Sequence, residues 1–199
     1  MSYNKKMNLL LYIHGKGGSP DESEHYKKLF ADCDVIGLEY KTVEEIHNAV
    51  KNFKSHYDKI ILIANSIGAF FAMNADIEKY LQKAYFISPI VDMEKIIKNL
   101  MEINKISEED LKRAGTIQIP FGENLSWEYL KYVRENPLKW SVPTKILYGS
   151  KDNLTTLETI KNFAEKNNFE VTIMENGEHW FHTEEQMNFL DNWIKNWRD

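Results

Sequence analysis

Short apolar runs alternate with longer amphipathic segments along most of the chain. Six of these runs have the length and aliphatic content of buried strands, and each is bounded by Gly, Pro, Asp or Lys. They are 7–13 (MNLLLYI), 34–40 (DVIGLEY), 59–64 (KIILIA), 84–88 (AYFIS), 144–149 (TKILYG) and 169–174 (FEVTIM). Strands that alternate with helices are typical of a parallel sheet covered by helices. We therefore predict an α/β fold.

The segments between the strands show helical periodicity. Apolar residues recur at helical spacing from Val43 to Tyr57, which predicts a crossover helix between the second and third strands. Near the end of the chain an apolar stripe runs from Phe189 to Trp197, and the sequence TEEQ (183–186) before it is a capping box. We expect the last helix to begin near Thr183.

One interval breaks this alternation. From about Ile90 to Val142 no strand pattern is present, only helical pieces such as MEKIIKNLMEINK and SWEYLKYVREN separated by AGTIQIPFGE. We predict a helical cap inserted at about 90–142 into a chain that forms one domain from residue 1 to 199. The large apolar side chains of this interval either attach the cap to the sheet or line a pocket, and the sequence does not distinguish the two roles. These side chains are Met93, Ile97, Met101, Trp127, Tyr129, Tyr132 and Trp140.

The composition is that of a globular protein. The chain has 199 residues, of which 43% are hydrophobic and 28% charged, enough for one domain without disulfides. Cys33 is the only cysteine and the N-terminal segment has no pattern of a signal peptide, so we expect a cytoplasmic protein. The apolar runs are shorter than the roughly 20 residues of a membrane-spanning helix, and we expect no membrane partner. The net charge is -5 with scattered lysines, which argues against nucleic acid, while the oligomeric state cannot be read.

The stretch IILIANSIGAFFA (60–72) places a single hydroxyl between two apolar runs, where a strand is expected to end and a helix to begin. A serine in such a turn adopts a sparsely populated backbone conformation, and its hydroxyl stands above the sheet only if the residues two before and two after are small. Ala64 and Gly68 meet this requirement. The alternative is that Ser66 only caps the helix that follows.

Two further residues fit the same chemistry. A hydroxyl is a poor nucleophile until a base takes its proton and a carboxylate orients that base. Asp152 follows the fifth expected strand in YGSKDNL, and His179 lies after the sixth in NGEHWFHT. The carboxyl ends of parallel strands meet at one edge of a sheet, where ligands bind. The positions predict a catalytic triad of Ser66, Asp152 and His179.

The ANSIG turn, followed in the chain by Asp152 and then His179, resembles the α/β-hydrolase family, whose nucleophile elbow is usually Gly-x-Ser-x-Gly. Ala64 stands here in place of the first Gly. The resemblance covers almost the whole chain and implies a minimal core, a six-stranded, mostly parallel sheet of order 2-1-3-4-5-6 with helices on both faces. It implies a fold and a mechanism but no particular substrate.

The loop HGKGGS (14–19) directly follows the first strand, and its three glycines exclude a helix or strand interior. In the family that the chain resembles, this loop and the residue after the nucleophile each supply one backbone N–H to the oxyanion hole. The resemblance assigns these donors to Lys16 and Ile67. A phosphate-binding loop is the alternative, but the spacing of a P-loop is absent. Whether the Lys16 side chain enters the pocket stays open.

Other residues compete for these roles. His182 is an alternative base, but it directly precedes the expected last helix, so we favour His179. Asp92 follows the fourth strand, a position from which some members of the family supply the acid, whereas Asp152 fits the commoner pattern. The remaining histidines lack carboxylates or Cys at metal-ligand spacing, and we expect no metal site.

We therefore expect a serine hydrolase in which Ser66 attacks an acyl carbonyl, His179 acts as base and then as acid, and Asp152 orients the imidazole. An acyl-enzyme forms and water hydrolyses it, and no cofactor is implied. Small carboxylic esters are the expected substrates, with thioesters and short peptides left open. One alternative is a small-molecule-binding protein that keeps the fold without turnover. Another is a flavodoxin-like nucleotide-binding module, which leaves Asp152 and His179 unexplained.

Overall fold

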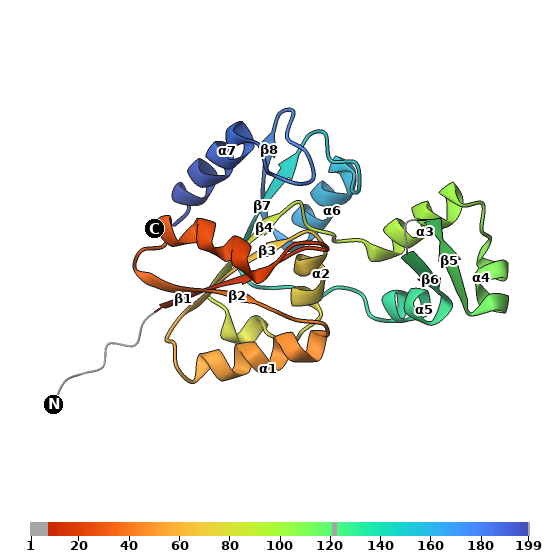
Figure 1. Ribbon diagram of the computed structural model, residues 1–199, viewed down its shortest axis with the longest axis horizontal. Coiled ribbons are helices and arrows are strands. Elements are labelled where there is room, and N and C mark those ends of the chain that lie inside the picture. Colours follow the sequence, from red (N-terminus) through yellow and green to blue (C-terminus); the bar gives the residue numbers. More distant parts are fainter. Residues whose placement is uncertain (1–7, 121–122, 199) are drawn as a thin grey trace. The chain divides into compact units, whose positions relative to one another are not determined.

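The computed structural model describes residues 8–120 and 123–198 (Figure 1). Six strands form one parallel sheet of order β2-β1-β3-β4-β7-β8, which confirms the predicted fold class and strand order. Met7, the first residue of the first expected strand, lies outside the described residues. The strands of this sheet are β1 (Asn8–Ile13), β2 (Cys33–Leu38), β3 (Ile60–Asn65), β4 (Lys83–Ile87), β7 (Thr144–Gly149) and β8 (Glu170–Met174).

The helices begin where the sequence offers caps. Thr42 and Glu45 form a capping box at one helix, and Thr183 and Gln186 form the predicted capping box at the last helix. The helices are η1 (Pro20–Lys28), α1 (Val43–Lys54), α2 (Ile67–Met73), η2 (Glu78–Tyr80), α3 (Met93–Ile103), α4 (Glu108–Ala114), α5 (Trp127–Glu135), α6 (Leu157–Asn167) and α7 (Glu184–Lys195).

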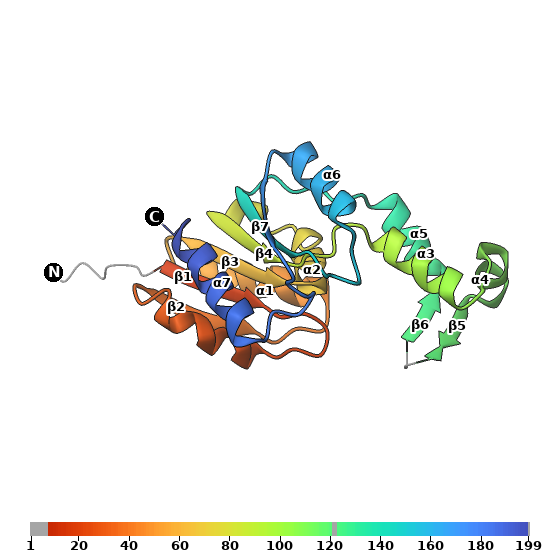
Figure 2. The ribbon, with the colours of Figure 1, turned by 90° about the horizontal axis from the view of Figure 1, so that it is seen from above.

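Helices cover both faces of the sheet, with η1 and α7 on one side and α1 and α2 on the other (Figures 1 and 2). The alternation of side chains along the central strands explains both layers, because neighbouring residues point to opposite faces. On the α7 side, Leu10, Tyr12, Ile61, Ile63, Tyr85 and Ile87 pack with Leu190, Trp193 and Ile194. The central strands are thus apolar on both faces, as expected for a covered parallel sheet.

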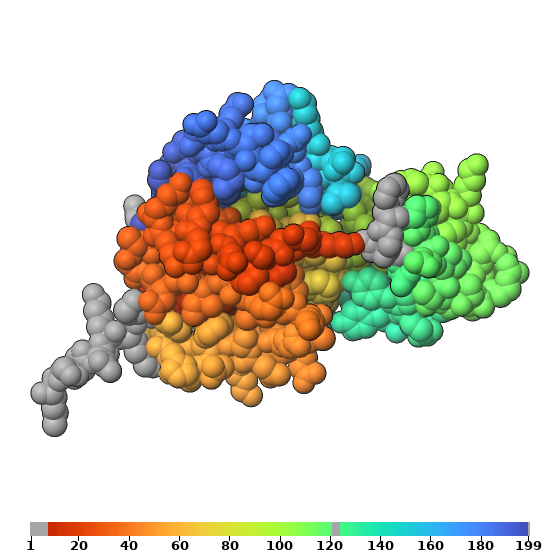
Figure 3. Space-filling view, viewed as in Figure 1, coloured from red at the N-terminus to blue at the C-terminus, as the bar shows by residue number. Residues whose placement is uncertain are grey.

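The segment η1 is fastened to α7 by a small charge cluster. Asp191 is 7% exposed. Its carboxylate accepts a hydrogen bond from His25 at 2.6 Å and forms an ion pair with Lys28 at 2.8 Å. Figure 3 shows these two segments side by side on one face, η1 in red and α7 in blue. The loop that follows β1 is therefore anchored to the last helix of the chain.

Residues 92–138 form a compact unit of their own, while residues 1–91 and 139–199 form the other. Within the smaller unit, Arg134 on α5 donates to Glu94 on α3 at 2.8 Å and to both carboxylate oxygens of Glu108 at the start of α4. Met93, Ile97, Met101, Leu111 and Leu130 are buried. This unit lies within the range predicted as a cap, and its role as a cap stays a prediction.

The prediction that no strands occur between Ile90 and Val142 is wrong. Strands β5 (Thr116–Ile119) and β6 (Glu123–Ser126) form an antiparallel two-stranded sheet in this interval. Each strand has only four residues, and so short an alternation of polar and apolar residues is hard to distinguish from a loop. Buried Ile119 and Leu125 explain why the pair is stable within its own unit.

A glycine at the end of β7 allows a close approach to the loop that carries His179. A Cβ added to Gly149 would lie 2.4 Å from the carbonyl oxygen of Gly177 and 2.5 Å from that of Glu178. Since both contacts are with backbone, Gly149→Ala should lower the free energy of unfolding by about 1–3 kcal/mol, the usual cost of overpacking. Thermal unfolding followed by circular dichroism measures this loss. Lys151→Ala, an exposed change two residues after Gly149, serves as the control, and equal melting temperatures for both variants would contradict the prediction.

Candidate active site

Ser66 lies in a strained turn between β3 and α2. Its φ of 50° and ψ of -121° lie in a region that non-glycine residues rarely adopt. The turn is possible because α2 begins very close to β1: a Cβ added to Gly68 would lie 2.4 Å from the carbonyl oxygen of His14. Ser66 makes no side-chain cap to α2, which removes the alternative that it serves only as a helix cap.

The structure brings the three predicted triad residues together. The Nε2 atom of His179 lies 2.8 Å from Ser66 Oγ, and its Nδ1 atom lies 2.7 Å from Asp152 Oδ2. Because the carboxylate of Asp152 accepts, Nδ1 carries the proton and Nε2 is the acceptor for the serine hydroxyl in the neutral ring. The imidazole is thus held in the tautomer that a general base requires.

Asp152 is held by the loop after β7. Its side chain is fully buried and accepts hydrogen bonds from the backbone N–H groups of Leu154 at 2.8 Å and Thr155 at 3.0 Å, and from the Thr155 hydroxyl at 3.2 Å. Burial opposes ionisation, but the bonds from His179 and the two N–H groups outweigh it, and the pKa of Asp152 lies below its usual value. Sequence reasoning missed Thr155, although Asp side chains commonly accept hydrogen bonds from backbone N–H groups two or three residues further on.

The loop after β1 reaches the nucleophile. Gly15 packs on Ser66, since a Cβ added there would lie 3.2 Å from the Cβ of Ser66. The N–H of Gly18 donates to the carbonyl of Gly15 at 3.2 Å and closes a turn that contains Lys16. Ile67 is the first residue of α2, where backbone N–H groups have no acceptor within the helix. The two predicted oxyanion donors therefore belong to segments that flank Ser66.

The rival candidates have other contacts. Asp92 caps α3 and accepts from the N–H of Lys95 at 2.9 Å. His182 is exposed; its Nδ1 lies 2.8 Å from the carbonyl oxygen of Trp180, and its ring stacks on the Trp180 ring. Cys33 is half-buried, and burial raises the pKa of its thiol. Neither Asp92 nor His182 takes a place in the hydrogen bonds between Ser66, His179 and Asp152.

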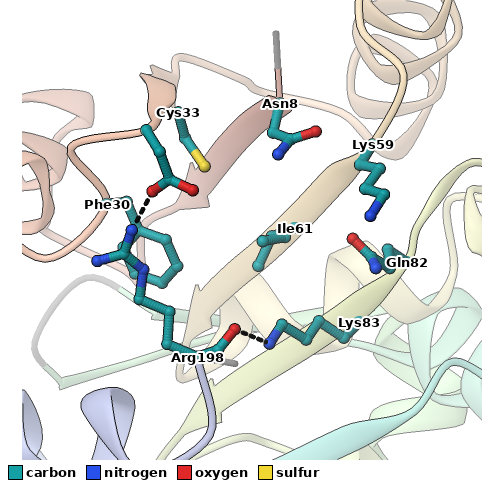
Figure 4. A pocket seen from close by; sticks show the side chains of 9 residues that line it. Asn8, Phe30, Cys33, Lys59, Ile61, Gln82, Lys83 and Arg198 are labelled. Carbon is teal, nitrogen blue, oxygen red and sulfur yellow. Dashed lines mark hydrogen bonds and ion pairs between the residues drawn. The ribbon is translucent and has the colours of Figure 1, made fainter.

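A polar cavity of about 260 Å³ lies at the opposite edge of the sheet (Figure 4). It is lined by the first residues of β1, β2 and β4 (Asn8, Cys33 and Lys83), together with Phe30, Asp32, Lys59, Ile61, Gln82 and Arg198. Arg198 pairs with Asp32, and Lys83 donates to the carbonyl oxygens of Trp197 and Arg198 at 2.7 and 2.8 Å. Since Ser66, Asp152 and His179 follow the carboxyl ends of their strands, this cavity is separate from their site.

Within residues 8–120 and 123–198, no group of three or more His, Cys, Asp or Glu side chains is arranged to hold a metal ion. Among the same residues, every helix is too short or too polar to serve as a membrane span.

No protein-family model matches the sequence, and no curated protein matches it significantly. Solved structures do match in fold. Est1E from Butyrivibrio proteoclasticus with ferulic acid bound aligns with a TM-score of 0.74 at 17% identity, over 98% of this chain and 90% of that one. An esterase of Pyrococcus furiosus, Pf2001, aligns with a TM-score of 0.63 at 20% identity, over 98% and 84%.

The α/β hydrolase domain-containing protein 10 from mouse aligns with a TM-score of 0.68 at 15% identity, over 94% of this chain and 88% of that one. The three likenesses extend over nearly the whole chain. The observed strand order is the one that the resemblance to this family implies. The chain therefore has the α/β-hydrolase fold.

Proposed function

We propose that the protein is a serine hydrolase that cleaves carboxylic esters through an acyl-enzyme. The observation that carries this proposal is the continuous hydrogen bonding from Ser66 Oγ through His179 to the buried carboxylate of Asp152. These residues lie far apart in sequence, and no structural need of the sheet requires that they meet. A nucleophile, a base and a group that orients the base are the parts that acyl transfer requires.

In the proposed reaction, His179 Nε2 takes the proton of the Ser66 hydroxyl as Oγ attacks the acyl carbonyl. The negative oxygen of the tetrahedral intermediate is stabilised by the backbone N–H groups of Lys16 and Ile67. The imidazolium then gives its proton to the leaving alcohol, and the acyl group stays on Ser66. Water repeats the sequence with His179 as base and releases the carboxylic acid. Asp152 remains ionised and stabilises the imidazolium throughout.

Two observations favour carboxylic esters with an apolar part. Trp180 and Leu154 are 66% and 46% exposed, and they lie one and two residues beyond His179 and Asp152. Large apolar side chains in the loops of a catalytic site are available to hold an apolar acyl or alcohol group. Among the proteins of similar fold, Pf2001 is named an esterase, and Est1E has been solved with ferulic acid, an aromatic carboxylic acid.

The reactivity of Ser66 can be tested by covalent labelling. A fluorophosphonate probe should add to one residue, Ser66, because His179 activates that hydroxyl, and mass spectrometry of the digested protein locates the adduct. Ser66→Ala should abolish labelling. Ser88→Ala is a matched control, since Ser88 also follows a strand with a positive φ of 44° and is buried. An unlabelled wild-type protein would favour the non-catalytic binding protein instead.

The acid of the triad can be identified by two substitutions. Asp152→Asn should reduce kcat for a chromogenic acetate ester by about 10⁴-fold, because the amide no longer fixes the tautomer of His179. Asp92→Asn should change kcat less than about twofold, since Asp92 only caps α3 and Asn is an equally good cap. Both rates are measured by steady-state kinetics. The reverse pattern would move the role of the acid to Asp92.

The rate should depend on pH through His179. A base must be neutral to accept a proton, so kcat/KM should fall in acid and level off once the base is neutral. Asp152 should add no second step above the usual carboxyl pKa, because its own pKa is lowered and it is already ionised there. The lowered pKa of Asp152 also stabilises the folded protein at pH values above the pKa that this carboxyl has in the unfolded chain. This stabilisation is lost as the pH falls through the pKa of Asp152 in the folded protein. A flat profile of kcat/KM would contradict the assignment of His179.

A further inference from the structure

A chain of side-chain hydrogen bonds begins at the residue before Ser66. The Nδ2 atom of Asn65 donates to the Tyr12 hydroxyl at 2.9 Å, and that hydroxyl donates in turn to the carboxylate of Glu22. Tyr12 belongs to β1 and is 1% exposed. Its hydroxyl thus links the end of β3 to η1, which follows the loop after β1.

The carboxylate of Glu22 lies against that loop. A Cβ added to Gly18 would come within 2.9 and 3.0 Å of the two carboxylate oxygens. At the other end of the same turn, Gly15 packs on Ser66. The turn from Gly15 to Gly18, which contains the proposed oxyanion donor Lys16, therefore lies against Ser66 at one end and against the Glu22 carboxylate at the other.

The Tyr12 hydroxyl is suited to a permanent link. Burial, the neighbouring Tyr26 and the Glu22 carboxylate raise the pKa of Tyr12 far above its usual value, so the hydroxyl keeps its proton and continues to donate. The Oδ1 atom of Asn65 is buried and has no partner among the described residues. The bond from Nδ2 to Tyr12 is then the contact that orients the Asn65 amide.

We propose that Tyr12, Asn65 and Glu22 are positioning residues that hold the Gly15–Gly18 turn at the distance from Ser66 that oxyanion stabilisation requires. This inference rests on the proposed function. Oxyanion donors stabilise a transition state because they are already in place when charge develops. A displacement of about 1 Å at a catalytic site can cost about 10²-fold in rate, so a link that fixes this turn has a measurable effect on catalysis.

Tyr12→Phe removes one hydroxyl and breaks the chain of bonds at its centre. The expected result is a fall in kcat of about tenfold for a chromogenic ester with KM nearly unchanged. The displaced N–H groups of the turn stabilise the transition state rather than the bound substrate. The rate of fluorophosphonate labelling of Ser66 should fall in parallel. Tyr57→Phe is the matched control, since the Tyr57 hydroxyl also donates to a carboxylate, that of Asp34, at 2.8 Å. Asp34 lies near the start of β2, at the other edge of the sheet from Ser66.

Two variants of Glu22 complete the test. Glu22→Ala should lower kcat as Tyr12→Phe does, and Glu22→Gln should restore it, because the amide oxygen still accepts from Tyr12. The double variant Tyr12→Phe with Glu22→Ala should be no slower than either single variant, since both break one link.

A kcat within twofold of wild type for Tyr12→Phe would overturn the inference and leave the proposed function intact. An equal loss of kcat in Tyr57→Phe would also overturn it, because the effect would then be one of general stability. A wild-type protein that neither labels nor hydrolyses esters would overturn the proposed function, and this inference with it.

Discussion

The absence of a side chain at Gly68, where a Cβ would lie 2.4 Å from the carbonyl oxygen of His14, is the constraint on which the site depends. It lets α2 start directly against β1, so the chain reverses sharply at the end of β3. That reversal forces Ser66 into its unusual backbone conformation and turns its hydroxyl toward the imidazole of His179. A side chain at position 68 would meet this carbonyl oxygen at 2.4 Å, so the helix or the strand would have to shift.

The backbone strain at Ser66 is compensated by bonds to neighbouring segments. The N–H of Ser66 donates to the carbonyl of Ile87 at 3.0 Å, and the carbonyl of Ser66 accepts from Ile90 at 3.1 Å and from Ala69 at 3.2 Å. These bonds come from the end of β4, the loop after it and the first turn of α2. A strained residue persists only where its surroundings determine its position in this way.

Sequence patterns predicted the sheet because its strands are buried on both faces and therefore read as unbroken apolar runs. They also located Ser66, Asp152 and His179, since residues after the carboxyl ends of parallel strands converge on one edge whatever their separation along the chain. The sequence pattern did not predict the hairpin of β5 and β6, because its strands are short and pair with each other rather than with the main sheet. The hydrogen bonds from Asn65 through Tyr12 to Glu22 were not predicted for another reason. They depend on which buried hydroxyl meets which carboxylate, and the spacing of residues along the chain does not give that information.

The segment from Asp92 to Leu138 is inserted between β4 and β7. These two strands are hydrogen-bonded neighbours in the sheet. It has buried apolar residues of its own and an arginine that joins its three helices. The strands β3 and β7 and the loop that carries His179 belong to the other unit. An insertion whose two ends join neighbouring strands can therefore differ in length or sequence between relatives while the order of the parallel strands stays the same.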